Sequence, residues 1–253
     1  MPEDRPRVRT VERYEPPYRM NRFPSDFVSK LAREIAVILA VEDTPALEGP
    51  RWEEIFARCI DGEWKPTAVG LDDVRLEQCA WSCKTVKNNN PSNASSARLI
   101  SGRNSPDYSY SVSDIRAAEP AEVGRMILGI WNERVSSVRA RYRHLRTVVL
   151  LKKPDFMEFA VYEFDTLMYE SERYVWTWNR NRNLEGHDRE SGEHRFTWQP
   201  HGSQFTIIEP VPADRTAFAF RRRPEAEQEH RERVLEAMGF GPDWFEVLPE
   251  RPS

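Results

Sequence analysis

The sequence predicts an α/β fold in which helices flank a mixed central β-sheet, and three observations support it. Helix-like and strand-like segments alternate over residues 24–165, in the order helix, helix, strands, helix, strands. Residues 146–152 contain a continuous apolar run that is typical of a central strand. Short aromatic and polar segments follow residue 165. We therefore expect additional β-strands in the C-terminal half.

The composition indicates a polar protein of one large domain. The chain has 253 residues, 31% of them charged, and a formal net charge of -4. No apolar run approaches the roughly 18–20 residues of a membrane span, and the N-terminus lacks the apolar core of a signal peptide. Three cysteines without CxxC spacing fit reduced thiols. We expect a cytoplasmic protein that has no membrane partner.

The first half begins with an arm and two helices. Residues 1–23 are rich in proline and charge, which predicts an extended N-terminal arm. Phe27, Leu31 and Ile35 recur at helical spacing, so a helix is expected from residue 26 to about 41. Gly49 and Pro50 begin a second helix. A turn region at 62–70, strands at 74–76 and 80–86, a polar loop at 87–96, a short strand at 98–100 and a loop at 102–110 then follow.

The second half begins with a long helix from residue 119 to about 142. We expect strands at 146–152, 157–164, 174–178, 195–198, 204–208 and 217–220, and a last helix at 224–238 closed by Gly239. Residues 24–253 are expected to form a single domain, with a core at about 24–165, an elaboration at about 166–223 and a C-terminal helix at 224–239.

Residues 49–87 carry the strongest chemical signal. Ser82 and Lys84 alternate along an apolar strand, so both point to one face. A lysine there needs partners for its ammonium group, and Asp72 or Asp73, just before the preceding strand, is a natural one. Carboxylates that hold a divalent metal, with a cation near the attacked phosphate, are what metal-dependent phosphodiester hydrolysis requires.

The series Gly49-x-x-x-Glu53, Asp73 and Ser82-x-Lys84 resembles the PD-(D/E)XK nuclease superfamily, which includes many type II restriction endonucleases. The resemblance implies a restriction-endonuclease-like core in which Asp73 is the central metal ligand and Glu53 the helix carboxylate. Lys84 would position or activate the attacking water. It also implies an endonuclease that cleaves double-stranded DNA with Mg²⁺, for which Mn²⁺ can substitute, and that acts as a homodimer on a symmetric site.

Ser82 departs from the superfamily, which usually has Asp or Glu at this position. Some restriction enzymes with Ser-x-Lys fill the gap with a glutamate from elsewhere. Glu53 is our first choice for that glutamate, and Glu54 and Glu77 are the alternatives.

Each of these residues also has a non-catalytic explanation. The paired aspartates suit a turn, the helix glutamates suit a helix N-terminus, and Lys84 suits an edge strand that must resist aggregation. The functional interpretation depends on their occurrence together, in this order.

Two later segments mix aromatic side chains with arginine and asparagine, at 174–183 and 194–204. Arginine, asparagine and glutamine can read base edges or hold phosphates. The alternative is a twisted sheet with tryptophans in its core. The candidate DNA-binding residues, including two polar loops, are Asn88, Asn89, Asn90, Arg103, Asn104, Arg180, Arg182, Gln199, His201, Ser203 and Gln204.

Other site classes lack a motif. The sequence contains no GxxxxGK[ST] or GxGxxG, so no nucleotide cofactor is expected. The histidines show no HxH or HExxH pattern, and we assign them no metal. Two other functions stay open: a catalytically inactive DNA-binding protein on the same fold, for which Ser82 argues, and an accessory protein of a defence system whose arm folds on a partner.

Overall fold

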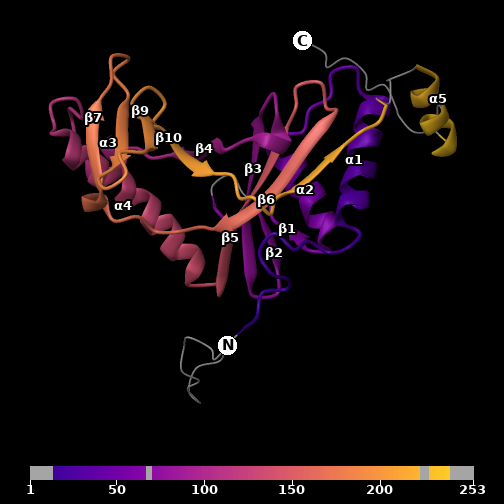
Figure 1. Ribbon diagram of the computed structural model, residues 1–253, viewed down its shortest axis with the longest axis horizontal. Helices are drawn as coiled ribbons and strands as arrows, with labels where there is room; N and C mark the ends of the chain where they lie inside the picture. Colours follow the sequence, from indigo (N-terminus) through magenta and orange to yellow (C-terminus); the bar gives the residue numbers. More distant parts are fainter. Residues whose placement is uncertain (1–13, 67–69, 223–227, 240–253) are drawn as a thin grey trace, which may run out of the picture.

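The computed structural model describes residues 14–66, 70–222 and 228–239, and in these residues the chain forms two β-sheets (Figure 1). Sheet A is mixed and has the order β1-β2-β3-β5-β6-β11; sheet B is antiparallel and has the order β4-β10-β9-β8-β7. The α/β class is therefore confirmed. The strands are β1 (Glu63–Trp64), β2 (Val74–Leu76), β3 (Cys79–Lys87), β4 (Ser96–Arg103), β5 (His144–Lys152), β6 (Glu158–Asp165), β7 (Tyr174–Trp178), β8 (Leu184–Asp188), β9 (His194–Gln199), β10 (Gln204–Pro210) and β11 (Thr216–Ala219).

Two helices cover one face of sheet A, and a third joins the two sheets (Figure 1). The spacing of Phe27, Leu31 and Ile35 places them on one side of α1, where all three are fully buried against the sheet. α2 begins at Pro50, whose fixed φ suits a first helical turn, after Gly49 in a left-handed conformation. The helices are α1 (Phe27–Val41), α2 (Pro50–Cys59), α3 (Pro106–Tyr110), α4 (Pro120–Arg139) and α5 (Gln228–Ala237).

Strands β3 and β5 form the centre of sheet A. They pair in parallel over their whole length, from Cys79 opposite His144 to Lys87 opposite Lys152. The apolar run of β5 is buried throughout, as expected for a central strand. A parallel pair needs a crossover connection, and here that connection contains β4, α3 and α4.

Helix α4 packs between the sheets. Its buried residues Ile127 and Trp131 share one apolar core with Ala80 and Leu145 of sheet A and with Phe196 of sheet B. The second face of sheet A is further covered by β4, which contributes apolar residues to a third core with β5 and β6. Sheet B is thus held against sheet A by continuous packing rather than by a linker.

The described part of the expected N-terminal arm lies against sheet A. Tyr18 stacks on Trp81 at a ring-centroid distance of 5.9 Å, and its hydroxyl donates to the Glu163 carboxylate at 2.6 Å. Glu163 also accepts from the Trp81 indole and from Arg146, an ion pair buried on both sides. Because one buried carboxylate serves these three donors, the segment around Tyr18 is tied to the centre of the sheet. Residues 1–13 lie outside the described residues.

Several expected boundaries differ from the structure. α4 ends at Arg139, where the regular i→i−4 pattern stops: the amides of Arg141 and Tyr142 both bond to the Val138 carbonyl. The strand expected at 98–100 extends over all of β4, since it pairs with β10 along its length. The loop expected at 102–110 contains α3, and neither β1 nor β8 was expected. The expected last helix is seen from Gln228; residues 223–227 lie outside the described residues.

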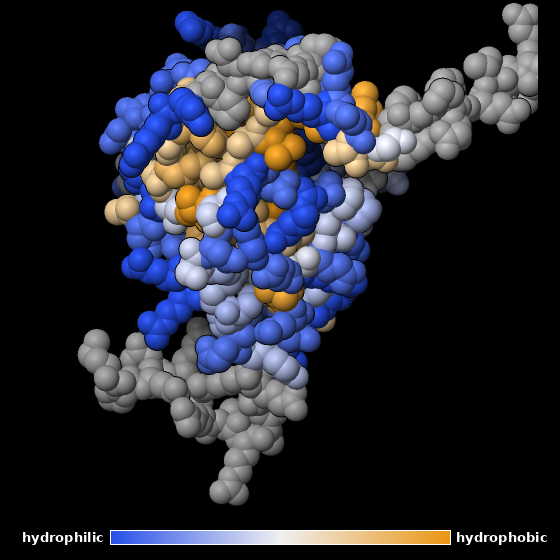
Figure 2. All heavy atoms as spheres, turned by 90° about the vertical axis from the view of Figure 1, so that its right-hand side faces the viewer, coloured by the Kyte–Doolittle hydropathy of each residue, from blue (hydrophilic) through white to orange (hydrophobic). Residues whose placement is uncertain are grey.

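In the described ranges, no helix is both long and apolar enough to cross a membrane. Seen from the side of α1 and α5, the surface is mostly hydrophilic and is interrupted by apolar side chains (Figure 2). The large exposed apolar residues of these two helices are Val37, Val234 and Leu235, and Met238 follows α5 directly.

The contact between α4 and sheet B can be tested at Gly124. A Cβ atom there would lie 2.2 Å from the ring of Trp176, which is buried under the helix. We expect Gly124→Ala to lower the free energy of unfolding by about 1–3 kcal/mol through overpacking. Urea denaturation followed by tryptophan fluorescence measures this change.

Gly129→Ala is the matched control in the same helix. There the closest atom is the hydroxyl of Tyr110, at the end of a side chain that is 45% exposed and free to turn away. The alanine should be neutral or stabilising by up to about 1 kcal/mol, because it removes the glycine penalty in a helix. Equal effects at the two positions would contradict the close approach of α4 to Trp176.

Candidate active site beside strands β2 and β3

Asp73 is fixed against β3 by the hairpin that follows it. Val74 pairs with Trp81, so Asp73 falls opposite Ser82 in the antiparallel register. The carboxylate oxygen Oδ2 of Asp73 accepts the backbone N–H of Cys83 at 2.8 Å and lies 3.4 Å from Ser82 Oγ. The side chain is only 8% exposed. Asp73 is therefore a buried, oriented carboxylate.

Ser82 and Lys84 follow each other on one face of β3. The residues between and beside them, Trp81 and Cys83, belong to the core on the opposite face, under α1 and α2. Ser82 is fully buried and Lys84 is half-buried. β3 pairs with β5 along its whole length, whereas its pairing with β2 ends at Trp81, so Lys84 has a strand partner on one side only and its explanation as an edge-strand residue is not contradicted.

Glu53 lies in the first turn of α2. The indole Nε1 of Trp64 donates to its carboxylate at 3.1 Å. Burial raises the pKa of Glu53, the negative charge of Asp73 raises it further, and the charge of Lys84 lowers it. The Glu53 carboxylate is therefore near enough to Asp73 and Lys84 to be affected by both charges.

The pKa of Asp73 is likewise raised. Burial is the largest cause, and it outweighs the lowering by Lys84 and by the hydrogen bonds from Cys83 and Ser82. Two carboxylates with raised pKa values beside each other form a site where a cation would offset charge repulsion. The donor set of Asp73, Glu53 and the Ser82 hydroxyl consists of oxygen atoms, which fits Mg²⁺ bound by one or two carboxylates and completed by water and phosphate.

The other candidate glutamates have different surroundings. Glu54 forms an i,i+4 ion pair with Arg58 at 2.6 Å on the exposed side of α2. Glu77 is exposed in the turn between β2 and β3, where its φ is +54°. Of the three glutamates, Glu53 is the one coupled to Asp73.

Asp72 ties two elements together instead of facing Lys84. Its buried carboxylate accepts from Lys65 Nζ at 2.7 Å and from Arg141 Nη1 at 3.0 Å. The two cations come from the segment before β2 and from the residues after α4. These two ion pairs therefore hold the chain in place at Asp72, just before Asp73 and the β2–β3 hairpin.

A cleft of about 640 Å³ opens next to Asp72, between the segment before β2 and the helices α3 and α4. Lys65, Arg134 and Arg141 bring positive charge to its walls, and Glu133 and Asp72 bring negative charge. Arg134 also donates to the backbone carbonyl of Arg103, at the end of β4. The cleft therefore extends from Asp72 toward Arg134, which contacts the end of β4 in sheet B.

Most of the residues expected to contact DNA meet at one end of the strands of sheet B. Leu184 pairs with Trp198 and Trp198 with Phe205, so the β7–β8 turn and the β9–β10 turn lie at the same end. Arg103, the last residue of β4, pairs with Gln204 and lies at this end too. The expected residues at this end of sheet B are Arg103, Arg180, Arg182, Gln199, His201, Ser203 and Gln204.

The β7–β8 turn is ordered by Asn179. Its Oδ1 accepts the amides of Asn181 and Asn183 at 2.9 and 3.0 Å, and Arg182 has a φ of +59°. Arg180 and Arg182 are both exposed at the tip. The turn therefore presents two guanidinium groups on a constrained backbone.

Asn104 and the Asn88–Asn90 loop do not belong to this exposed group. Asn104 lies beside it but is fully buried: its Nδ2 donates to the Ile127 carbonyl, and its backbone carbonyl accepts from the Trp198 indole. Its side chain serves the core and is not available at the surface. The Asn88–Asn90 loop comes before the start of β4, and the eight residues of β4 span roughly 23 Å from Ser96 to Arg103 at 3.3 Å per residue.

Sequence reasoning missed a cluster of Glu185, His187 and His194 on β8 and β9. One signal was present, because Glu185-x-His187 puts two metal-binding side chains on one face of a strand. Nothing in the sequence indicates that His194 is the neighbour of His187 on the adjacent strand.

Comparisons with protein-family models, with curated proteins and with solved structures found no match for this chain.

The charge coupling in the site predicts an effect of pH on stability. In the unfolded chain these carboxyls ionise near pH 4, and in the folded protein they ionise at higher pH, so ionisation costs stability as the pH rises above about 4. Glu53→Gln removes one charge but keeps an oxygen for the Trp64 indole. We expect it to raise the melting temperature of metal-free protein at pH 8 and to have little effect at pH 4.

Glu54→Gln is the control, since its carboxylate is one residue away and only pairs with Arg58. It should lower stability by about 0.5 kcal/mol or less at pH 8. Thermal melts in EDTA between pH 4 and pH 8 distinguish the two variants. A Glu53→Gln variant whose melting temperature shifts equally at both ends of this range would contradict the coupling to Asp73.

Proposed function

We propose that this protein is a metal-dependent endonuclease that cleaves double-stranded DNA, with Mg²⁺ as its cofactor and Mn²⁺ able to substitute. The observation that carries the proposal is the position of the buried Asp73 carboxylate, which accepts the Cys83 amide and lies beside Ser82 on the strand that carries Lys84. Glu53, in the first turn of α2, is close enough for the charges of Asp73 and Lys84 to shift its pKa. Their order, a helix glutamate, an aspartate before a strand and a lysine on the next strand, is the one that resembles the PD-(D/E)XK superfamily. The mixed sheet with flanking helices is consistent with its core.

In this proposal Asp73 and Glu53 hold the metal. The bound cation would supply charge stabilisation at the phosphate and a lower pKa for a water molecule. Lys84 orients the attacking water and stabilises negative charge on the phosphoryl oxygens. Ser82 brings no charge; its hydroxyl lies 3.4 Å from Asp73 Oδ2 and helps orient that carboxylate.

DNA recognition is proposed for the end of sheet B where the β7–β8 turn carries Arg180 and Arg182. Arginine there can contact phosphates or a guanine edge, and the neighbouring Gln199, Ser203 and Gln204 can add hydrogen bonds. The Asn88–Asn90 loop would make a second, separate contact with the backbone. A homodimer would present two such surfaces to the two halves of a symmetric site.

A second function is favoured by Ser82, which leaves the site one carboxylate short of the usual superfamily set. The protein would then bind DNA without cutting it. A third, an accessory role in a defence system, remains if DNA is not bound at all.

Lys84→Ala tests the catalytic proposal. Wild-type protein should cleave plasmid DNA of varied sequence in Mg²⁺ or Mn²⁺ and should be inactive in EDTA. Loss of the Lys84 ammonium should lower the cleavage rate at least about 100-fold, because it removes a charge aimed at the phosphate. Lys87→Ala is the control on the same strand, since Lys87 is exposed at its end.

Three outcomes separate the functions. Cleavage that needs Lys84 but not Lys87 supports the endonuclease. Tight DNA binding without cleavage, whether or not the DNA is methylated, supports the inactive binding protein. Cleavage that is unchanged in Lys84→Ala shows that the assigned site is wrong.

The recognition surface predicts a salt effect. DNA affinity should fall steeply with salt concentration, because arginine–phosphate contacts release counterions. Arg180→Ala and Arg182→Ala should each reduce the slope of log affinity against log salt by about 1 if they contact phosphate. Arg58→Ala, on α2 and paired with Glu34 and Glu54, should leave the slope unchanged. Unchanged slopes in all three variants would show that the DNA-binding surface is not at this end of sheet B.

A further inference from the structure

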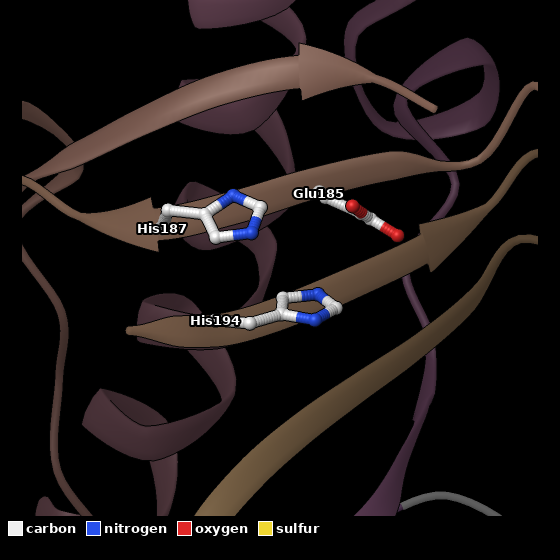
Figure 3. A group of neighbouring side chains, drawn as sticks. All are labelled: Glu185, His187 and His194. Atoms are coloured by element: carbon white, nitrogen blue, oxygen red, sulfur yellow. The ribbon is translucent and has the colours of Figure 1, made fainter. Parts of the chain in front are cut away.

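The outer face of sheet B carries three side chains that converge from two strands. Glu185 and His187 lie on β8 and His194 on β9, and Figure 3 shows them gathered over the same patch of the sheet. One ligand atom of each lies within 4.8 Å of the other two. The rings of His187 and His194 are stacked with centroids 4.7 Å apart.

A β-bulge brings His194 to this face. Gly186 pairs with Phe196, whereas His187 pairs with His194, so Arg195 is the extra residue on β9. In a regular ladder His194 would share the face of Phe196, which is buried in the core. The bulge instead turns His194 beside His187. Bulges of this kind commonly re-aim a side chain at a functional site.

Hydrogen bonds orient two of the three donors. Nε2 of His194 lies 2.8 Å from the Phe196 carbonyl oxygen, so the neutral ring carries its proton on Nε2 and keeps a lone pair on Nδ1. Oε1 of Glu185 accepts from Asn179 Nδ2 at 2.6 Å. A histidine whose second ring nitrogen donates to a carbonyl, and a carboxylate held by an amide, are typical supports of metal ligands.

We propose that Glu185, His187 and His194 bind one transition-metal dication, with Zn²⁺ as the best fit. Three protein ligands with two imidazoles and one carboxylate match zinc sites that keep a position open for water. Zinc–ligand bonds of about 2.0–2.2 Å put the donor atoms roughly 3.5 Å apart, which small side-chain rotations from the metal-free arrangement provide.

Mg²⁺ does not fit this site. It prefers carboxylate, carbonyl and water oxygens, and two of the three donors here are nitrogens. The guanidinium of Arg98, which donates to the neighbouring Thr197 hydroxyl, adds a positive charge that opposes the binding of any dication. The bonds to the two imidazole nitrogens must offset this repulsion, and they are stronger for Zn²⁺ than for Mg²⁺. The proposed zinc site is thus chemically distinct from the oxygen site at Asp73, and it does not depend on the endonuclease proposal.

Zinc titration of the tag-free protein, by isothermal calorimetry in millimolar Mg²⁺, tests the site. We expect one Zn²⁺ per chain, and Co²⁺ in its place should give the intense visible absorption of a low-coordinate site. His187→Ala, His194→Ala and Glu185→Gln should each weaken Zn²⁺ binding, the histidine variants by at least about 100-fold. Zn²⁺ should also raise the melting temperature of the wild type and not that of the histidine variants.

Two controls define the location. His201→Ala, which removes an exposed histidine in the β9–β10 turn, and Asp73→Asn, which alters the oxygen site, should both retain the stoichiometric Zn²⁺ site. Glu185→Gln keeps the shape of the side chain, so it remains informative if a histidine variant does not fold. The proposal is overturned if wild-type protein binds no Zn²⁺ stoichiometrically, or if the three ligand variants bind it as tightly as the wild type.

Discussion

The parallel pairing of β3 with β5 is the constraint on which the rest of the structure depends. Two parallel neighbours cannot be joined by a tight turn, so the chain must leave the sheet after the first strand and return to the end of the sheet where that strand began. Here that connection carries β4 away from sheet A and brings α4 back across its face. The position of sheet B follows, because β4 is its edge strand and α4 is the surface on which it packs.

The same pairing explains the electrostatic cost of the candidate active site. Ser82 lies on β3 between Asp73 on one side and Thr147 of β5 on the other, so it is buried, and Asp73 is buried beside it. Burial raises the pKa of Asp73 even though Lys84 is close. Asp72 is also buried, but its carboxylate pairs with Lys65 and Arg141. The two adjacent aspartates therefore have different partners: Asp72 joins two elements by ion pairs, and Asp73 accepts the backbone amide of Cys83.

The sequence predicted what depends on local pattern. β3, β5 and α1 could be placed because their apolar residues follow one period, and Asp73 could be placed near Ser82 because a short hairpin joins them. β8 was missed because its five residues include a glycine and three polar side chains and so lack a strand-like apolar pattern. Periodicity also does not specify a strand's partner, so the division into two sheets and the burial of Asn104 between α4 and sheet B were not predictable. The contact of His187 with His194 depends on a bulge, which has no period of its own.

The path of the chain through the two sheets has a consequence for how this molecule comes apart. The chain enters sheet A, leaves for β4, returns for β5 and β6, leaves again for β7–β10, and ends in sheet A with β11. Neither sheet is formed by one continuous stretch of sequence. Cutting the chain at any single point therefore cannot give one fragment with all of sheet A and another with all of sheet B. The two sheets should therefore melt as one cooperative unit, without a foldon confined to either sheet. Recombination that exchanges sheet B must replace two separate segments at once, one with β4 and one with β7–β10.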